Sequence, residues 1–204
     1  MSLQAPTPRL ILASASSTRH ALLTGAGLVF ESCAAHIDED EIKRSAQGEG
    51  ADAGDTALLL AELKAQRIAR SHPDAIVIGC DQLLVCEDRW FDKPADLTEA
   101  SAHLQALRGR SHTLMTAILC QRGPQRLWHH VAKPKLTMRH FSDAFLADYL
   151  QAEGMAITGS VGAYRLEGLG VHLFDRIDGE HAAILGLPLL ALLGFLRQHG
   201  VLAP

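Results

Sequence analysis

The chain has 204 residues, of which 48% are hydrophobic and 21% are charged, as in an ordinary soluble globular protein. This composition excludes a wholly disordered chain, a collagen and a coiled coil. With 19 basic and 23 acidic residues the net charge is −4, so the chain lacks the basic excess of a protein whose main ligand is a nucleic-acid backbone. The length fits one domain, or one domain with two lobes.

The cysteines and the apolar segments indicate a cytoplasmic protein with no membrane partner. The cysteines form no C-x-x-C pair and no zinc-ligand spacing, as is typical of reduced thiols: Cys33, Cys80, Cys86 and Cys120. The longest apolar stretch, residues 182–196, is shorter than the roughly 20 residues of a membrane span and contains Pro188. No basic segment followed by a long apolar core opens the chain, so we expect no secretory signal.

The first half of the chain alternates between predicted strands and helices. Residues 9–13 and 28–33 read as strands, and the hydroxyls of residues 14–17 cap a helix that runs to about Gly25. Residues 38–41 and 48–54 read as a polar connection. The apolar periodicity of residues 55–70 predicts a helix, and the continuous apolar run 75–85 predicts a strand that is covered on both sides.

The second half continues the alternation, which favours a layered α/β fold. Thr98 is expected to cap a helix through Leu107, and two strands, 111–121 and 125–141, flank a turn at Gly123. Ser142 is expected to cap a helix to about residue 152, and residues 163–173 read as another strand. The last helix is expected to begin near Pro188 and to end at residue 200.

A segment rich in hydroxyl groups lies between the first predicted strand and the first helix. Ser14 and its neighbours, the free N–H groups of the helix start and Arg19 are together suited to hold a phosphate. The ordinary alternative is a plain helix cap with one exposed arginine.

Two acidic positions are candidates for chemistry. Asp81 lies inside an apolar strand, where a buried carboxylate needs a partner, a metal or water. Its ordinary alternative is a residue at the strand end that caps a turn. Asp38 and Glu39 offer oxygen ligands for a hard cation, or they form a solvated loop.

Three further residues gain meaning only in combination. Lys64 lies near the apolar face of its helix, Lys93 precedes a proline that fixes the local backbone, and Glu167 lies in a predicted short strand. Taken singly, these are a snorkelling lysine, an ordinary turn and a surface residue. Together with the acidic pair and the arginine they make a set that is suited to a polyphosphate and a divalent cation.

These residues resemble the Maf family of nucleotide pyrophosphatases. The matching segments occur in the family's order and cover nearly the whole chain. They are residues 10–16 (LILASAS), 37–39 (IDE), 60–65 (LAELKA), 78–82 (IGCDQ), 93–94 (KP), 162–164 (GAY) and 186–189 (GLPL). One such segment alone is a weak signal, whereas the ordered set is specific.

The resemblance implies one Maf-like domain over residues 1–204, with an α/β fold, a central mixed sheet and two lobes around a cleft. It implies hydrolysis of a nucleoside triphosphate to monophosphate and pyrophosphate with Mg²⁺ or Mn²⁺. By motif matching, Asp81 takes the position of the proton acceptor and, with Glu39, of the metal ligands. The phosphate-binding positions fall on Ser14, Arg19, Lys64 and Lys93. A homodimer is the family expectation, with no nucleic-acid or membrane partner.

Two positions resemble the branch of the family that prefers 7-methyl-GTP: Gln82, directly after the key aspartate, and Glu167. Two rival functions remain open. One is a pyrophosphatase of the same family that acts on dTTP and UTP. The other is a nucleotide-binding regulator of septum formation with little turnover. The chain departs from the family at the first helix, where Ser-Pro is absent, Thr18 replaces a frequent aromatic residue and His20 replaces the second basic residue.

Overall fold

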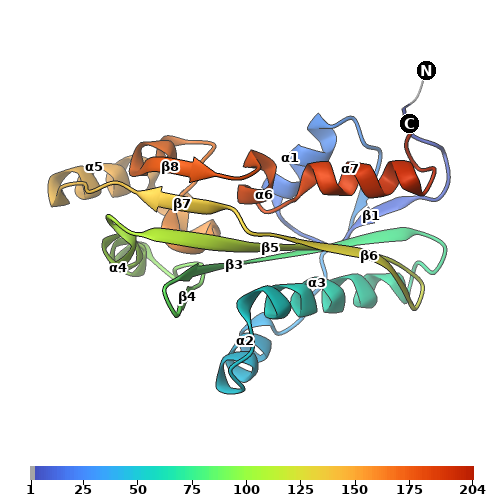
Figure 1. Ribbon diagram of the computed structural model, residues 1–204, viewed down its shortest axis with the longest axis horizontal. Helices are drawn as coiled ribbons and strands as arrows, with labels where there is room; N and C mark the ends of the chain where they lie inside the picture. The colour runs from blue at the N-terminus through green and yellow to red at the C-terminus, as the bar shows by residue number, and fades with distance from the viewer. Residues whose placement is uncertain (1–2) are drawn as a thin grey trace. The chain divides into compact units, whose positions relative to one another are not determined.

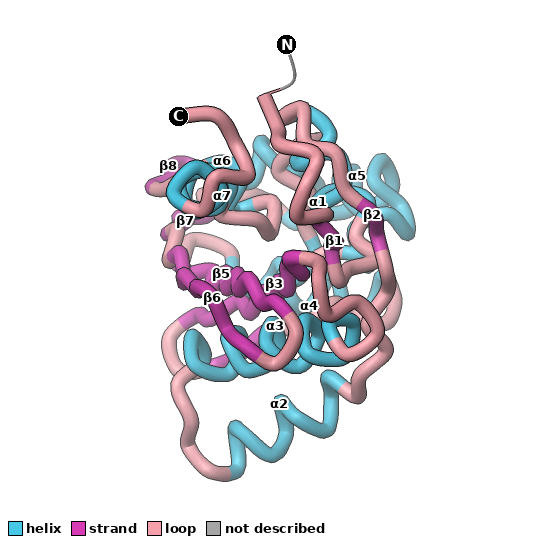
Figure 2. Tube along the Cα trace, turned by 90° about the vertical axis from the view of Figure 1, so that its right-hand side faces the viewer, coloured by secondary structure: helices cyan, strands magenta, loops and turns pink. Residues whose placement is uncertain are grey.

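The structure is a computed structural model that describes residues 3–204. In this part of the chain, eight strands form one mixed sheet with the order β2-β1-β3-β5-β7-β8, while β4 pairs with β3 and β6 pairs with β5. Figure 1 labels these strands, except β2, together with the helices, and Figure 2 labels β2. The strands are β1 (Leu10–Leu12), β2 (Glu31–Ser32), β3 (Ile76–Cys86), β4 (Arg89–Phe91), β5 (Ser111–Arg122), β6 (Gln125–Ala132), β7 (Lys135–Met138) and β8 (Phe174–Asp178).

Seven α-helices accompany the sheet in the described residues, so the predicted α/β fold with a central mixed sheet and flanking helices is confirmed. The helices are α1 (Ser17–Gly25), α2 (Glu39–Gly48), α3 (Ala53–Ala69), α4 (Leu97–Leu107), α5 (Asp143–Glu153), α6 (His181–Ile184) and α7 (Leu189–Gln198). No helix within residues 3–204 has the length and apolar character needed to cross a membrane.

The chain divides into two compact units, each made of separate segments. The first unit comprises the residues as far as Asp81 together with 116–132 and 181–204, and the second comprises 82–115 and 133–180. Strands β3 and β5 each contribute residues to both units. The boundary in β3 falls directly after Asp81, so the chain passes from one unit to the other within a strand.

In the first unit, helices cover both faces of the sheet. Alternate residues of β3 point to opposite faces, and Ile76, Ile78 and Cys80 join an apolar core with buried residues of β1, α1 and α7. Helix α3 lies on the other face, as Figure 1 shows, and α2 packs on the outer side of α3 (Figure 2). Side chains that alternate with the apolar core in β3, including that of Asp81, therefore face α3.

A glycine brings α3 unusually close to β3. A Cβ atom at Gly79 would lie 2.0 Å from the carbonyl oxygen of Ala61 in α3, so no other residue fits there without moving the helix. Lys64 follows Ala61 by nearly one helical turn, and Asp81 follows Gly79 by one strand period. The close approach at Gly79 thus brings Lys64 beside Asp81.

The second unit has a buried polar contact in an aromatic setting. The ring Nε2 of His112 lies 2.9 Å from the hydroxyl of Tyr164, and the ring of Phe174 packs near both. Burial lowers the pKa of His112 to about 4. This hydrogen bond holds Tyr164 in place. The segment that contains Glu167 begins directly after Tyr164.

Several predicted elements are confirmed. The strands at 9–13 and 75–85 are β1 and β3, and the helices at 17–25, 55–70 and 143–152 are α1, α3 and α5, with Ser142 as the cap of α5. The last helix is α7, which begins directly after Pro188. All four cysteines are free thiols, and three of them are buried.

The predicted polar connection is wrong in its first part, because residues 39–48 form helix α2. The side chain of Asp38 accepts a hydrogen bond from the backbone N–H of Glu41, and three acidic residues lie in the first turn, where they interact favourably with the helix dipole. Only Ala46 of this helix is buried, so its sequence lacks the apolar stripe by which helices are recognised.

The predicted strand at 163–173 is also wrong. This segment consists of turns and short 3-10 helices, and the strand β8 begins only at Phe174. Gly162 and Ala163 both have positive φ angles, 75° and 60°, which a strand does not allow. Glu167 therefore lies in a turn.

Three boundaries also differ from expectation. Lys133 and Pro134 interrupt the strand predicted at 125–141 and divide it into β6 and β7, since proline offers no N–H to a ladder. Helix α4 is capped by Asp96 rather than by Thr98. The strand predicted at 28–33 is reduced to the two residues of β2.

The buried His112 makes the stability of the protein dependent on pH. The unfolded chain binds a proton at this residue below about pH 6.5, whereas the folded chain binds it only below about pH 4. The free energy of unfolding should therefore fall by about 3 kcal/mol between pH 6.5 and pH 4 on account of this residue. Urea denaturation of the wild type and of His112→Gln over this range measures it. Parallel curves for the two proteins would contradict the expectation.

Candidate active site

Five of the eight predicted site residues lie in the first unit: Ser14, Arg19, Glu39, Lys64 and Asp81. The first four come from the loop after β1 and from α1, α2 and α3, and their contacts gather them near Asp81 at one edge of the sheet. Strands β1 and β3 run parallel, and their paired residues end at Leu12 and Ile78. Beyond this point, the loop that carries Ser14 leaves β1 and β3 continues to Asp81. The carboxyl edge of a parallel sheet is where α/β proteins bind ligands.

A buried ammonium group joins the two predicted acidic residues. The Nζ atom of Lys64 lies 2.5 Å from Oδ1 of Asp81 and 2.8 Å from Oε1 of Glu39. The side chains of Lys64 and Asp81 are only 9% and 6% exposed. Lys64 is therefore no snorkelling lysine, and the carboxylate of Asp81 has its partner inside the protein rather than in a turn.

Glu39 reaches this cluster because it is the first residue of α2. The helix is capped at Asp38, and its docking on α3 sets the first turn of α2 beside Lys64. A negative charge at a helix start interacts favourably with the helix dipole. Asp38 and Glu39 therefore do not form a solvated loop, which was the ordinary alternative. They begin a helix, and the carboxylate of Glu39 belongs to the cluster.

Arg19 holds three segments of the first unit together. Its Nε donates to the carbonyl oxygen of Gly186 at 2.8 Å, and its Nη1 donates to the carbonyl of Cys80 at 3.1 Å and to Oγ of Ser14 at 3.4 Å. Within residues 3–204 its Nη2 has no protein partner. Arg19 is thus partly structural, and it retains N–H donors for an anion.

The hydroxyl-rich segment forms a helix cap, as predicted. Oγ of Ser16 accepts from the backbone N–H of Arg19 at 3.3 Å, and the N–H of Ser16 donates to Oγ of Ser14 at 3.1 Å. Helix α1 behind this cap has nine residues, and its start lies beside the guanidinium of Arg19. The cap and an anion-binding role are therefore compatible in one segment.

Cys80 lies within the same group of charges but is not suited to act as a nucleophile. Burial raises the pKa of its thiol to about 11, although the charges of Arg19 and Lys64 lower it in part. The thiol therefore stays protonated near neutral pH, and only a thiolate is an effective nucleophile.

The three remaining predicted residues, Gln82, Lys93 and Glu167, belong to the second unit. Gln82 follows Asp81 directly in β3, so the two side chains point to opposite faces of the strand. Lys93 is exposed and follows β4, while the proline after it is buried. The structure groups the predicted phosphate and metal residues, except Lys93, in one unit and the predicted base-selecting residues in the other.

Two residues that the sequence analysis missed hold the turn around Glu167. Glu153 has a side chain only 5% exposed, and its Oε2 lies 3.3 Å from Nη1 of Arg165. Its Oε1 accepts from the backbone N–H of Leu169 at 3.0 Å. Arg165 in turn has its Nε 3.8 Å from Oε1 of Glu167. No spacing in the sequence relates Glu153, at the end of α5, to this turn, so only Arg165, two residues before Glu167, offered a signal.

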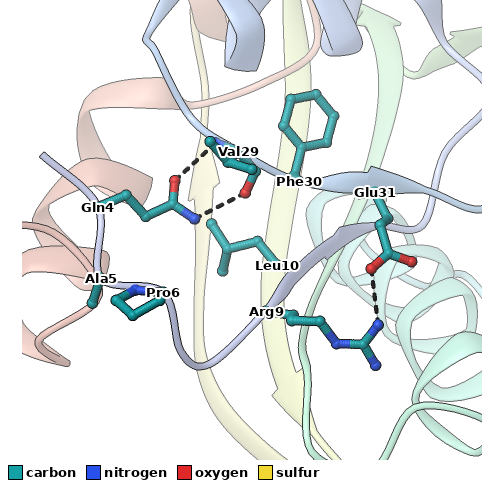
Figure 3. Close-up of a pocket in the computed structure, with 8 residues that line it drawn as sticks. All are labelled: Gln4, Ala5, Pro6, Arg9, Leu10, Val29, Phe30 and Glu31. Carbon is teal, nitrogen blue, oxygen red and sulfur yellow. Dashed lines mark hydrogen bonds and ion pairs between the residues drawn. The ribbon is translucent and has the colours of Figure 1, made fainter. Parts of the chain in front are cut away.

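A separate pocket, shown in Figure 3, lies at the amino end of β1 and has a volume of about 360 Å³. None of the predicted site residues lines it. The side-chain amide of Gln4 donates to the carbonyl oxygen of Val29 and accepts from its N–H, each at 2.8 Å. Arg9 pairs with Glu31 at 2.9 Å. The pocket is thus at the strand end opposite to the charged cluster.

The acidic residues of the cluster fit a hard divalent cation. No group of three or more His, Cys, Asp or Glu side chains suited to a metal occurs in the described residues. Two carboxylate oxygens, from Glu39 and Asp81, nevertheless converge on one point, the Nζ atom of Lys64. Mg²⁺ commonly uses one or two protein carboxylates and takes its other ligands from phosphate oxygens and water. This donor set therefore suits Mg²⁺ or Mn²⁺ that is shared with a phosphorylated ligand.

Comparison with known proteins identifies the family. Residues 9–199 match the model of the Maf-like proteins. A nucleoside triphosphate pyrophosphatase of Granulibacter bethesdensis is 58% identical over 194 residues, which are 95% of this chain and 98% of the relative. The chain therefore belongs to the Maf family, as the ordered motifs predicted.

Two further relatives also match over nearly their whole length. A nucleoside triphosphate pyrophosphatase of Rhodospirillum rubrum is 52% identical over 200 residues, 98% of this chain and 99% of the relative. A 7-methyl-GTP pyrophosphatase of Rhizobium meliloti is 48% identical over 195 residues, 96% of this chain and 98% of the relative. Both names thus occur among the relatives of this chain.

Gly186 should be essential to the position of Arg19. It has a φ of 97°, and a Cβ there would lie 3.2 Å from Nε of Arg19. Gly186→Ala should therefore lower the free energy of unfolding by about 1–3 kcal/mol, through backbone strain, and weaken the binding of inorganic pyrophosphate. Thermal denaturation and calorimetric titration measure the two effects. Gly194→Ala in α7, where a Cβ meets no atom within 4 Å, is the control: it should raise the free energy of unfolding by about 0.5–1 kcal/mol, as Ala does inside a helix, and leave the binding of pyrophosphate unchanged.

Proposed function

We propose that this chain hydrolyses nucleoside triphosphates to monophosphate and pyrophosphate, with a preference for 7-methyl-GTP. The observation that carries the proposal is the cluster of Lys64, Asp81 and Glu39, in which the lysine and the aspartate are buried, beside Arg19 and the start of α1. This cluster combines a candidate base, cationic groups and an anion-binding helix start, which are the parts that cleavage of a phosphoanhydride requires. The names of the relatives support the reaction.

In the proposed reaction, water attacks the α-phosphorus and the bond between this atom and the bridging oxygen breaks. The carboxylate of Asp81 orients the water and accepts its proton. Arg19, Lys64 and Lys93 bind the phosphate oxygens, and Ser14 contributes a hydroxyl donor. A divalent metal at Glu39 and Asp81, when bound, offsets the negative charge that develops on the leaving pyrophosphate.

The preference for 7-methyl-GTP rests on the second unit. Guanine presents its N1–H and its amino group side by side, and the carboxylate of Glu167 can accept from both. Methylation at N7 gives the ring a positive charge. The charges of Glu153, Arg165 and Glu167 sum to −1, so the turn attracts a cationic base. Gln82 offers both a donor and an acceptor to another edge of the base.

The rival functions are less well supported. A regulator with little turnover has no need of a buried carboxylate paired with a lysine, as Asp81 is. Thymine and uracil would offer Glu167 only one N–H donor, where guanine offers two. We also propose a cytoplasmic location, which the four free thiols support, and a homodimer, which rests on the family alone.

Asp81→Asn should reduce kcat for pyrophosphate release by about 10²-fold or more, because the amide cannot accept the proton of the attacking water. The fold should persist, since Lys64 keeps Glu39 as a partner. Release of pyrophosphate from a panel of nucleoside triphosphates measures the activity. Asp88→Asn, in the exposed turn between β3 and β4, is the control and should behave as the wild type. Activity of Asp81→Asn within a few-fold of the wild type would rule out Asp81 as the base.

The wild type should turn over 7-methyl-GTP with a kcat/KM about ten- to hundredfold above that for dTTP, since thymine offers Glu167 one N–H donor and no positive charge, whereas 7-methylguanine offers two donors and a positive charge. The double variant Gln82→Thr with Glu167→Gln should shift this ratio toward pyrimidines. Because the phosphates of the two substrates are identical, a change in the ratio reports on the base alone. Equal kcat/KM values in the wild type, or an unchanged ratio in the variant, would exclude these two residues as selectors of the base.

A further inference from the structure

Lys64 occupies the point at which the two carboxylates of the cluster converge. Its Nζ atom lies 2.5 Å from an oxygen of Asp81 and 2.8 Å from an oxygen of Glu39. In the free protein, each of these carboxylates therefore already has a cationic partner. Lys64 is itself buried on α3, so water offers its ammonium group little competing solvation.

A divalent metal and the ammonium group cannot both occupy the point between these two oxygens. Mg²⁺ lies about 2.0–2.1 Å from its oxygen ligands, which places a metal bound to Glu39 and Asp81 almost where Nζ of Lys64 lies. The two cations would also repel each other at such short range. Metal binding at this pair therefore requires the lysine side chain to move.

The lysine has an alternative partner once a nucleotide is bound. Its flexible four-carbon side chain lets the ammonium group swing while the backbone of α3 stays in place. The phosphates of a nucleotide carry several negative charges and would lie near the same cluster, where Nη2 of Arg19 is also available. A shift of Lys64 onto a phosphate would free the two carboxylates for the metal that the phosphates bring.

We propose that Lys64 keeps the divalent metal out of the free enzyme and yields the carboxylates of Glu39 and Asp81 only when a nucleotide binds. This inference rests on the proposed function for the assignment of the two carboxylates to a metal. It adds a role for Lys64 beyond phosphate binding, namely control over the order in which the metal and the nucleotide enter the site.

Mn²⁺ titration of the nucleotide-free protein, followed by the electron paramagnetic resonance of the unbound ion, tests the proposal. The wild type should bind Mn²⁺ weakly. Lys64→Met keeps the length of the side chain but removes the ammonium group from both carboxylates, so its Kd for Mn²⁺ should be on the order of tenfold lower or more. The double variant Lys64→Met with Glu39→Gln should lose this gain. Arg67→Met removes a charge from the exposed side of α3 and should bind as the wild type does.

Equal affinity in the wild type and Lys64→Met would overturn the proposal, as would a gain that persists without Glu39. If Lys64→Met needs Mn²⁺ to fold, its melting temperature should rise with Mn²⁺ concentration, and this rise supports the proposal. If it does not fold at all, the wild type decides. A rise in its melting temperature below about 1 °C at millimolar Mn²⁺ supports the proposal, and a rise of several degrees overturns it.

These measurements need neither a nucleotide nor turnover, so they fail independently of the proposed function. Loss of activity in Asp81→Asn together with equal Mn²⁺ affinities would leave the pyrophosphatase in place and remove only the role of Lys64. Retained activity in Asp81→Asn would remove the proposed function, whatever the Mn²⁺ affinities are.

Discussion

The contact between Lys64 and Asp81 depends on the glycine at position 79, which has no side chain. Gly79 lets the backbone of α3 approach β3 so closely that a methyl group would overlap the carbonyl of Ala61. The rest of the cluster follows from this contact, because α2 docks on α3 and delivers Glu39 to the same ammonium group. Buried charges are tolerated only when they are paired, so the close packing of a helix on a strand and the chemistry of the site have one origin.

Sequence patterns predicted the elements with a strong apolar periodicity. They failed where helix capping or positive φ angles, rather than an apolar pattern, determine the local structure. The apolar runs of β3 and α3 were sufficient, whereas α2 is held by its cap at Asp38 and by acidic residues in its first turn, and it buries little apolar surface. Likewise, Gly162 and Ala163 turn the segment before Glu167 out of any strand. The motifs named the residues of the site, but neither motif nor spacing indicated that Lys64 bridges both carboxylates or that Glu153 holds the turn through Arg165.

The division of the chain into two units separates most of the residues proposed for the phosphates and the metal from those proposed for the base. All predicted phosphate and metal residues except Lys93 belong to the first unit, and both predicted base-selecting residues belong to the second. Asp81 and Gln82 are neighbours in β3 at the boundary. Under the proposed function, substitutions in the second unit would change the base preference and leave the packing of α3 on β3 untouched.

Helix α2 has a single buried residue, Ala46. Within the described residues its main packing partner is α3. Segments with so little buried apolar surface detach at a lower free energy than the core of the same protein. Glu39 is thus carried by an element that can undock while β3 and α3 remain folded. Warming would then release the carboxylate of Glu39 from the cluster by local unfolding at a temperature below global melting, while Asp81 and Lys64 remain paired.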